Sequence, residues 1–175
     1  MDDVILLSDN GIAVGVLAKD EVHTTQTPLH LAFSCHITDS DGRMLVTRRA
    51  LGKKTWPGVW TNSFCGHPRP GEDMLDAVRR RAQEELGVAL TSIRLVLPDY
   101  RYRAVDASGI VENEICPVHV AVIDGRLDPD PDEVSEWAWV GTEDLAEAIE
   151  RTPFVFSPWL REQLPLLRAH GEMRR

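Results

Sequence analysis

Residues 72–86 form the strongest helix signal in the chain, and they constrain the arrangement of the segments on either side. The apolar residues of this stretch recur at helical spacing and fall on one face; they are Met74, Leu75, Val78, Ala82 and Leu86. Pro70-Gly71 separates the stretch from what precedes it, and Gly87 is the expected stop. The sequence therefore predicts a helix over 72–86.

The segment just before this helix, residues 60–68, reads W-T-N-S-F-C-G-H-P. Cys65 and His67 are two residues apart, so an extended backbone would project both side chains to the same face. A thiol beside an imidazole can form part of a metal site, an activated nucleophile or a proton-transfer pair. A small cysteine in an apolar stretch can equally be core, and this segment alone leaves these alternatives open.

Strand signals outnumber helix signals in the rest of the chain. The predicted strands are 4–7, 12–18, 31–38, 44–48, 93–97, 100–105, 115–123 and 136–140, and further helices are predicted over 142–150 and 158–170. Residues 127–133, L-D-P-D-P-D-E, read as a polar loop without regular structure. Without internal repeats or a long linker, the pattern predicts one α+β domain over residues 1–175.

Composition narrows the class of protein. A hydrophobic fraction of 43% and a charged fraction of 27% are those of a soluble globular protein. We expect no export signal, because the chain starts with an acidic segment, and no membrane span, because no apolar run approaches the roughly 18 residues required. Three widely spaced cysteines fit reduced thiols, so we expect a cytoplasmic protein.

The charged residues point to a small anionic ligand. The net charge of −9 argues against a nucleic-acid or anionic-membrane partner. Basic residues nevertheless flank the 60–68 segment; they are Arg48, Arg49, Lys53 and Lys54 before it, and Arg69, Arg79, Arg80 and Arg81 after it. A small, highly charged anion would explain this clustering, and a solvated basic face is the alternative.

Glu112 and Glu114 form a second candidate constellation. The two carboxylates share strand parity and can face one side, which is costly unless a cation lies between them. The alternative is an exposed acidic turn. His23 and His30, on either side of a threonine-rich loop, are further candidates, although a lone histidine is usually structural or exposed.

Between Gly66 and Val88 the chain reads G-x5-E-x7-R-R-A-Q-E-E-L-G-V, which resembles the Nudix box, G-x5-E-x7-R-E-U-x-E-E-x-G-U with U aliphatic. The matching residues are Gly66, Glu72, Arg80, Glu84, Glu85, Gly87 and Val88. Arg81 replaces a glutamate of the box, and Ala82 is a small residue at an aliphatic position. The resemblance implies a Nudix α/β/α sandwich with a mixed sheet and extra N-terminal strands, its core over about 28–162.

Several further motifs are similar to those of the type I isopentenyl-diphosphate isomerases. W-T-N-S-F-C-G-H-P, the degenerate box, R-Y-R-A and E-N-E-I-C-P-V occur in the family's order between about Lys19 and Trp159. The resemblance implies interconversion of isopentenyl and dimethylallyl diphosphate, in isoprenoid biosynthesis, by protonation and deprotonation through a carbocation-like state. By position, Cys65 matches the catalytic thiol, Glu114 the catalytic carboxylate and Tyr102 the assisting tyrosine. Trp159 matches the aromatic residue that covers the cation.

The same resemblance implies two metal sites and a diphosphate site. The first metal would be Mn²⁺, Mg²⁺ or Zn²⁺, held by His23, His30, His67, Glu112 and Glu114. A second Mg²⁺ would join the diphosphate to Glu85 and to the backbone carbonyl of Cys65. The matching cationic contacts to the diphosphate are Lys19, Arg49, Lys53 and Arg81.

Two other functions compete with the isomerase. A Nudix diphosphate hydrolase is the first, and the arginine at position 81 argues against it. Arg81 and Glu85 can also form an ordinary helix salt bridge worth about 0.3–0.5 kcal/mol. A metal- or diphosphate-binding module without catalysis is the second. The sequence leaves open the oligomeric state, the metal, and which of Cys65 and Glu114 donates the proton in each direction.

Overall fold

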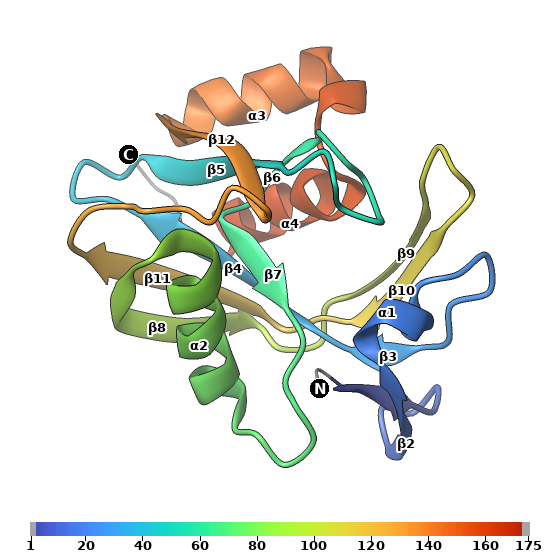
Figure 1. Cartoon of the computed structure of the whole chain (residues 1–175). Coiled ribbons are helices and arrows are strands. Elements are labelled where there is room, and N and C mark those ends of the chain that lie inside the picture. The colour runs from blue at the N-terminus through green and yellow to red at the C-terminus, as the bar shows by residue number, and fades with distance from the viewer. Residues whose placement is uncertain (1–2, 173–175) are drawn as a thin grey trace.

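The computed structural model describes residues 3–172, which form two sheets with helices around them (Figure 1). The first sheet contains β1 (Asp3–Leu7), β2 (Ala13–Ala18), β3 (His30–Leu31), β9 (Arg101–Val105) and β10 (Val111–Ile115), in the order β2-β1-β3-β10-β9. The short helix α1 (Lys19–Val22) follows β2. This sheet contains the two N-terminal strands that the sequence predicted.

The second sheet has seven strands and forms the centre of the sandwich. It contains β4 (Phe33–Thr38), β5 (Met44–Arg49), β6 (Trp60–Thr61), β7 (Phe64–Gly66), β8 (Ala89–Leu97), β11 (Val118–Asp124) and β12 (Val134–Val140). Its main order is β12-β5-β4-β11-β8, while β6 pairs with β5 and β7 pairs with β4. Parallel pairing of β4 with β11 makes the sheet mixed.

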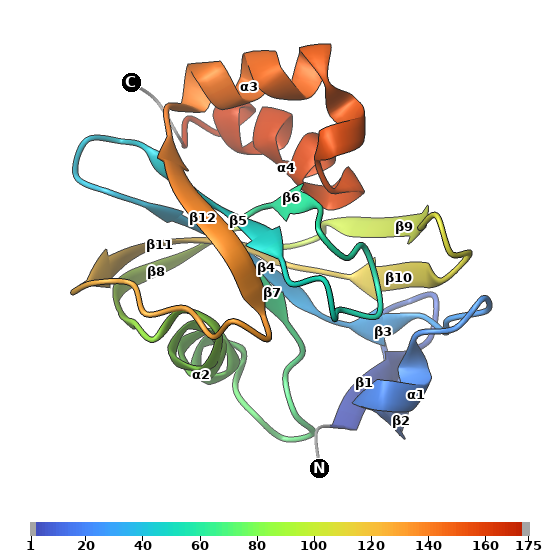
Figure 2. The same ribbon diagram turned by 45° about the horizontal axis from the view of Figure 1, so that its top comes forward.

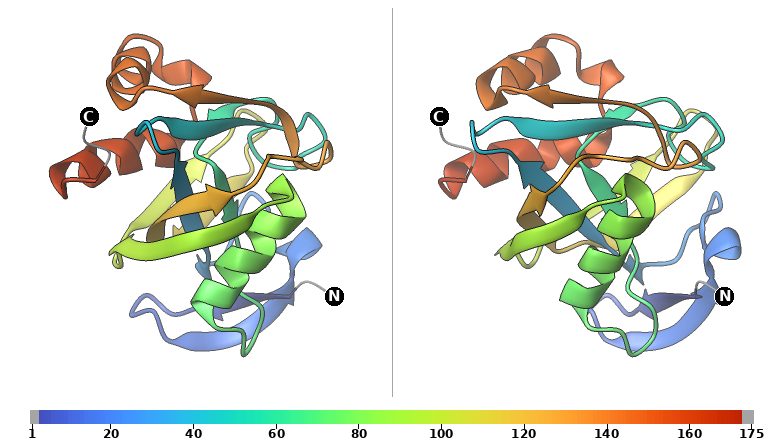
Figure 3. Two further views of the ribbon diagram at one scale, coloured as in Figure 1. Left: turned by 90° about the vertical axis from the view of Figure 1, so that its left-hand side faces the viewer. Right: turned by 60° about the vertical axis from the view of Figure 1, so that its left-hand side comes forward.

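Helices lie on both faces of the second sheet (Figure 2). They are α2 (Met74–Leu86) on one face, and α3 (Thr142–Arg151) and α4 (Pro158–Ala169) on the other, with a 3₁₀ turn, η1 (Pro153–Val155), between α3 and α4. The two side views in Figure 3 separate these layers. The predicted α/β/α sandwich is confirmed. None of the helices in residues 3–172 combines the length and apolar character needed to cross a membrane.

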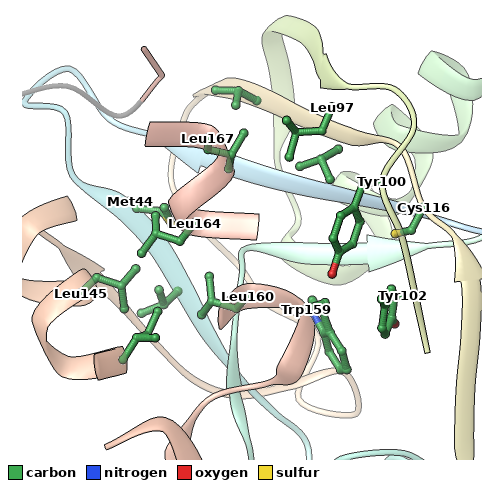
Figure 4. Close-up of a cluster of buried hydrophobic side chains, with 14 of the residues drawn as sticks. Met44, Leu97, Tyr100, Tyr102, Cys116, Leu145, Trp159, Leu160, Leu164 and Leu167 are labelled. Carbon is green, nitrogen blue, oxygen red and sulfur yellow. The ribbon is translucent and has the colours of Figure 1, made fainter. Parts of the chain in front are cut away.

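The alternation of side chains along the central strands explains the two helical layers. Phe33, Cys35 and Ile37 of β4 pack with the apolar face of α2, which includes Val78 and Leu86. Met44 and Val46 of β5 belong to a separate cluster that also contains residues of α3 and α4. Figure 4 shows Leu160, Leu164 and Leu167 of α4 in this second cluster. The strands are buried on both faces, so each face can carry a helix.

Helix α2 begins at Met74 rather than at residue 72, because Asp73 caps it. The Asp73 carboxylate accepts hydrogen bonds from the backbone N–H groups of Leu75 (2.9 Å) and Asp76 (3.4 Å). Gly87, with φ of 66°, ends the helix as predicted. Its missing Cβ also admits the following polar loop, since a Cβ there would lie 2.7 Å from the carbonyl oxygen of Asp128.

The predicted strand over 115–123 is wrong, because its residues belong to two strands in different sheets. β10 ends at Ile115 and β11 begins at Val118. The predicted strand 31–38 divides in the same way at Ala32, between β3 and β4. These two segments of the chain pass from one sheet to the other side by side: Ala32 N donates to Ile115 O at 3.0 Å, and Ser34 N donates to Pro117 O at 3.1 Å. A run of apolar residues does not reveal such a crossing, because the burial continues through it.

Candidate active site

Three of the residues implied by the resemblance form a row across neighbouring strands of the first sheet. Glu114 of β10 is in register with His30 of β3 on one side and with Tyr102 of β9 on the other. Register partners in a sheet project to the same face. All three side chains are buried, so the row forms one wall of an interior site. The alternative of an exposed acidic turn at Glu112-Asn113-Glu114 is wrong.

The strand β7 brings Cys65 to this wall from the second sheet. Cys65 is in register with Ser34 of β4, and His67 follows directly after the strand. Gly66 lies between them because there is no space for a side chain. A Cβ at this position would lie 2.7 Å from Cγ of Arg81 and 2.8 Å from Cζ of Phe33. The absent side chain therefore lets Arg81 of α2 cross close to the β7 backbone.

Three imidazoles and one carboxylate meet where the two sheets join. The ligand atoms of His23, His30, His67 and Glu114 all lie within 4.8 Å of one another. Oε1 of Glu114 is 3.3 Å from Nε2 of His30 and 3.4 Å from Nε2 of His67. Glu112, the fifth residue implied, adjoins this group through His23, with Oε2 lying 2.9 Å from the His23 Nε2 atom.

The donor atoms of this cluster fit a divalent cation. Several are buried and face one another without forming a well-aligned hydrogen bond within residues 3–172: Nε2 of His23, Nε2 of His30, both ring nitrogens of His67 and Oε2 of Glu112. Buried polar atoms are normally satisfied, and leaving them unpaired is costly. Nδ1 of His30 lies 2.9 Å from the carbonyl oxygen of Pro28, which orients its Nε2 toward the cluster.

The charge states of Glu114 and His67 also suit a metal site. Burial alone would raise the pKa of Glu114, but the adjacent His30 and His67 hold that pKa well below its usual value. Burial lowers the pKa of His67 to about 4, and the other two imidazoles act in the same direction. An ionised carboxylate and a neutral imidazole are the forms that bind metal ions.

A cavity of about 570 Å³ connects this cluster to the other predicted residues. Every residue implied for the site lines the cavity except His30, which is wholly buried. The lining therefore brings together the thiol of Cys65, the histidine–carboxylate cluster and the basic residues Arg49, Lys53 and Arg81. A pocket of this size and composition suits a small anion with an apolar portion.

Arg81 and Glu85 lie together at the base of the cavity, one helical turn apart on α2. Nε of Arg81 donates to Oε1 of Glu85 at 3.1 Å, and the guanidinium also contacts Glu84 (3.0 Å) and Glu133 (3.2 Å). The ordinary helix salt bridge considered from the sequence is therefore present. Both partners are nearly buried, however, so this pair differs from a solvated surface pair.

Lys53 and Arg49 extend into the cavity from the strand β5 and the loop after it. Lys53 forms an ion pair with Glu133. The Arg49 guanidinium donates to the backbone oxygen of Thr55 at 3.0 and 2.8 Å, and its central carbon lies 5.6 Å from the ring centre of Trp159. Arg49 is thus held beside the aromatic wall. Lys19, at the start of α1, completes the basic lining.

Cys65 is surrounded by hydrogen-bonding groups that the sequence did not single out. Its thiol lies 3.3 Å from Oδ1 of Asn62 and 3.4 Å from Oγ of Ser34. Ser34 in turn accepts a hydrogen bond from Nε2 of Gln163 on α4, at 2.9 Å. Burial raises the pKa of Cys65 to about 12, so the thiol is protonated at neutral pH.

Trp159 and Tyr102 are, with Phe64, the aromatic residues that line the cavity. Figure 4 shows the side chains of Trp159 and Tyr102 near each other. Their ring centres are 5.7 Å apart, and Trp56 packs edge-on against Trp159 at 5.4 Å. Nε1 of Trp159 donates to Oδ1 of Asn62 at 2.8 Å. Burial raises the pKa of Tyr102 well above its usual value, so its hydroxyl keeps its proton.

Two residues of the box serve the framework of the site. Arg80 forms two hydrogen bonds to Glu72, at 2.7 and 2.8 Å, and a third to the carbonyl oxygen of His67, at 3.1 Å. These contacts tie the segment between β7 and α2 to the helix. They place the imidazole of His67 relative to Arg81 and Glu85.

Sequence reasoning missed Ser34, Asn62, Glu133 and Gln163. One signal was available for Ser34: in the strand 33–38, Ser34 alternates with the apolar residues Phe33 and Cys35 and so faces the opposite side. Asn62 lies within the conspicuous 60–68 segment, but nothing local marks it as a hydrogen-bonding centre. Glu133 and Gln163 reach the site only through long-range packing.

The chain matches the model of the NUDIX domain family over residues 28–160. It is 63% identical over 164 residues to the isopentenyl-diphosphate Delta-isomerase of Clavibacter sepedonicus, covering 94% of this chain and 86% of that protein. It is 60% identical over 164 residues to the isopentenyl-diphosphate Delta-isomerase of Paenarthrobacter aurescens, covering 94% and 89%. The crystal structure of a Deinococcus radiodurans protein superposes with a TM-score of 0.72 at 20% identity, covering 94% and 98%. That likeness concerns the fold alone.

Proposed function

Because the chain belongs to the NUDIX domain family and, within it, to the isopentenyl-diphosphate Delta-isomerases, we infer how its cavity carries out this isomerisation. The enzyme interconverts isopentenyl diphosphate and dimethylallyl diphosphate. A proton is added to the terminal methylene carbon of the double bond, and another is removed from the methylene carbon on the other side of the branched carbon. The reaction is redox-neutral, so it needs an acid and a base but no hydride carrier.

One observation carries the assignment of roles: a protonated thiol and an ionised carboxylate line the same cavity. In our proposal, Cys65 and Glu114 are the two groups that exchange protons with the substrate carbons. Tyr102, in register with Glu114 and able to keep its proton, assists transfer on the carboxylate side. Glu114 belongs to the histidine cluster, which fixes its position and keeps it ionised.

The charge that develops on the substrate needs a wall of π-electrons and an absence of water. Trp159 is suited to this role because its indole is buried and held by Asn62. We propose that it faces the cation-like carbon, where a cation–π contact is worth up to about 2 kcal/mol when desolvated. The surrounding apolar cluster, including Trp56 and Tyr100, keeps this end of the cavity dry.

We propose that the diphosphate lies at the basic end of the cavity, against Lys19, Arg49, Lys53 and Arg81. Glu85 and the backbone carbonyl of Cys65 would hold a Mg²⁺ ion with it. His23, His30, His67, Glu112 and Glu114 would hold a second ion, Mn²⁺, Mg²⁺ or Zn²⁺. When bound, this second ion would supply positive charge that orients the Glu114 carboxylate and tunes its basicity. A cytoplasmic location is part of the proposal, supported by three unpaired cysteines.

Transfer of solvent protons to carbon tests the reaction and the roles together. In heavy water, the enzyme should incorporate deuterium into dimethylallyl diphosphate. Cys65→Ala and Glu114→Gln should each lose nearly all of this activity, whereas Cys35→Ser, which alters a buried thiol outside the cavity, should retain it. Retained isomerase activity in Cys65→Ala would overturn the assignment of the thiol. A wild-type protein that forms no allylic isomer, and whose diphosphate binding is unchanged by Cys65→Ala, would favour a binding module without catalysis.

The hydrolase alternative is tested with a nucleoside diphosphate derivative and Mg²⁺. Arg81 occupies the position of a box glutamate, and its guanidinium is already engaged by Glu84 and Glu85, which supports a role in binding rather than in activating water. We expect no rapid phosphate release. Rapid release without formation of an allylic isomer would contradict the isomerase reading.

A further inference from the structure

Glu133 joins two of the cations proposed to bind the diphosphate. It is the last residue of the polar loop 127–133, and its side chain lines the cavity. Oε1 of Glu133 lies 3.2 Å from Nη2 of Arg81, while Oε2 forms an ion pair with Nζ of Lys53. The Glu133 side chain is only 18% exposed, so this bridge is largely removed from solvent.

The backbone around Glu133 is fixed to both elements that carry these cations. Ala50 N donates to Glu133 O at 3.0 Å, and Lys53 N donates to Ala50 O at 3.1 Å. On the other side, Glu133 N donates to Asp130 O, and Asp130 N donates to Glu85 O, both at 3.0 Å. The carboxylate therefore enters the cavity from a frame connected to α2 and to the loop that carries Lys53.

The Glu133 carboxylate reduces the electrostatic repulsion between Lys53 and Arg81. Two cations that must contact one diphosphate repel each other before the substrate arrives, and burial strengthens the repulsion. A carboxylate that accepts hydrogen bonds from both cations holds their charged groups close together. The remaining N–H donors of the two cations stay available for the substrate. Interactions made in advance reduce the ordering cost of binding.

We propose that Glu133 is a positioning residue for the diphosphate: it bridges Lys53 and Arg81 and sets where these two cations meet the substrate. The inference rests on the proposed function, which assigns Lys53 and Arg81 to diphosphate binding. Its effect belongs to substrate binding and not to proton transfer, because Glu133 lies in the diphosphate-binding part of the cavity with Lys53 and Arg81.

The test uses Glu133→Gln in the full chain, with two measurements. The first is KM and kcat for isopentenyl diphosphate in the presence of Mg²⁺, and the second is the Kd of inorganic pyrophosphate with Mg²⁺ by calorimetry. Without the carboxylate, the substrate itself must bring Lys53 and Arg81 into position, and this ordering cost weakens binding, so we expect KM and Kd to rise about tenfold or more. The kcat value should stay within about twofold, because uniform binding is what is lost.

Two further variants separate positioning from general damage. Glu136→Gln removes a carboxylate from a surface pair with Arg48 (2.7 Å) on the neighbouring part of β12, and it should change neither KM nor Kd. Glu133→Asp keeps the charge and should recover part of the affinity. The midpoint of thermal unfolding is measured for each variant. If Glu133→Gln unfolds at a lower temperature than the wild-type protein, the test rests on Glu133→Asp: partial recovery of pyrophosphate affinity supports positioning by the carboxylate, and no recovery contradicts it.

Three results would overturn the inference. Unchanged KM and Kd would show that the bridge has no role in binding. Tighter pyrophosphate binding would show that Glu133 competes with the diphosphate, and a fall in kcat with KM constant would place its role elsewhere. Lys53→Ala distinguishes a wrong role for Glu133 from a wrong assignment of the diphosphate site. If Lys53→Ala leaves pyrophosphate binding unchanged, the diphosphate assignment itself fails; if it weakens binding while Glu133→Gln does not, only the role of Glu133 fails.

Discussion

The side chains of Cys65 and Trp159 share one hydrogen-bond acceptor, the Oδ1 atom of Asn62, at 3.3 and 2.8 Å. The orientation of the Asn62 amide is determined, because Nδ2 donates to the carbonyl oxygens of Cys35 (2.9 Å) and Phe64 (2.8 Å). The thiol proposed to transfer a proton and the indole proposed to face the cation are therefore positioned by a single buried group.

We expect Asn62→Ala to impair both activity and stability. Loss of the amide removes the hydrogen bonds to two buried carbonyl groups and the one from the Trp159 N–H, which should cost at least about 2 kcal/mol in the free energy of unfolding. A displaced indole or thiol can reduce kcat by up to about 100-fold. Denaturant unfolding and steady-state kinetics measure the two effects. Asn10→Ala, in an exposed turn, is the control, and an unchanged kcat in Asn62→Ala would assign Asn62 a purely structural role.

Replacement of His23 or His67 by glutamine should lower the metal content of the purified protein. Each variant removes one donor from a cluster whose ligand atoms lie within 4.8 Å of one another. Loss even of a residue that supports a ligand weakens metal affinity by about tenfold or more. Elemental analysis after dialysis provides the measurement. His170→Gln, at an exposed helix end, should keep the wild-type content, and equal metal in all of these proteins would refute the site.

The affinity for substrate should decrease as the pH rises through about 8. Burial lowers the pKa of Lys53 to about 8, and the nearby cations Arg49 and Arg81 act in the same direction. Below this pH the ammonium is charged and attracts the diphosphate; above it the charge is lost. KM for isopentenyl diphosphate should therefore rise above pH 8.

Lys53→Arg supplies the control for this pH dependence, because a guanidinium stays protonated throughout the range. The variant should show a flatter KM–pH profile between about pH 7 and 9.5 than the wild-type enzyme. If both proteins show the same rise in KM, another group is responsible, and Lys53 is not the titrating contact.

Gly66→Ala should destabilise the protein and displace Arg81. The added Cβ would lie 2.7 Å from Cγ of Arg81 and 2.8 Å from Cζ of Phe33, and such overpacking costs about 1–3 kcal/mol. We also expect weaker binding of pyrophosphate. Gly52→Ala is a matched control, since a Cβ there meets nothing within 4 Å. Equal unfolding free energies for the two variants would show that the contact at Gly66 relaxes without cost.

Local signals predicted helix α2 well and the strand crossings poorly. The apolar spacing of Val78, Ala82 and Leu86 and the stop at Gly87 are properties of neighbouring residues, and the helix follows them. The crossing at Cys116–Pro117 depends instead on a distant segment of the same chain, 32–34, that changes sheets beside it. A one-dimensional pattern contains no record of that partner.

The sequence by itself determined the family, the helix of the box and the candidate catalytic, metal-binding and cationic residues of the cavity, because these depend on residue types at short spacings. The tertiary structure decided how they meet. Glu114 lies between His30 and Tyr102 because the consecutive strands β9 and β10 pair with the distant strand β3 in one register, and a shift of one residue would turn its carboxylate to the opposite face. The bridge of Glu133 to Lys53 and Arg81 has the same origin, since loop, sheet and helix meet only when the chain is packed.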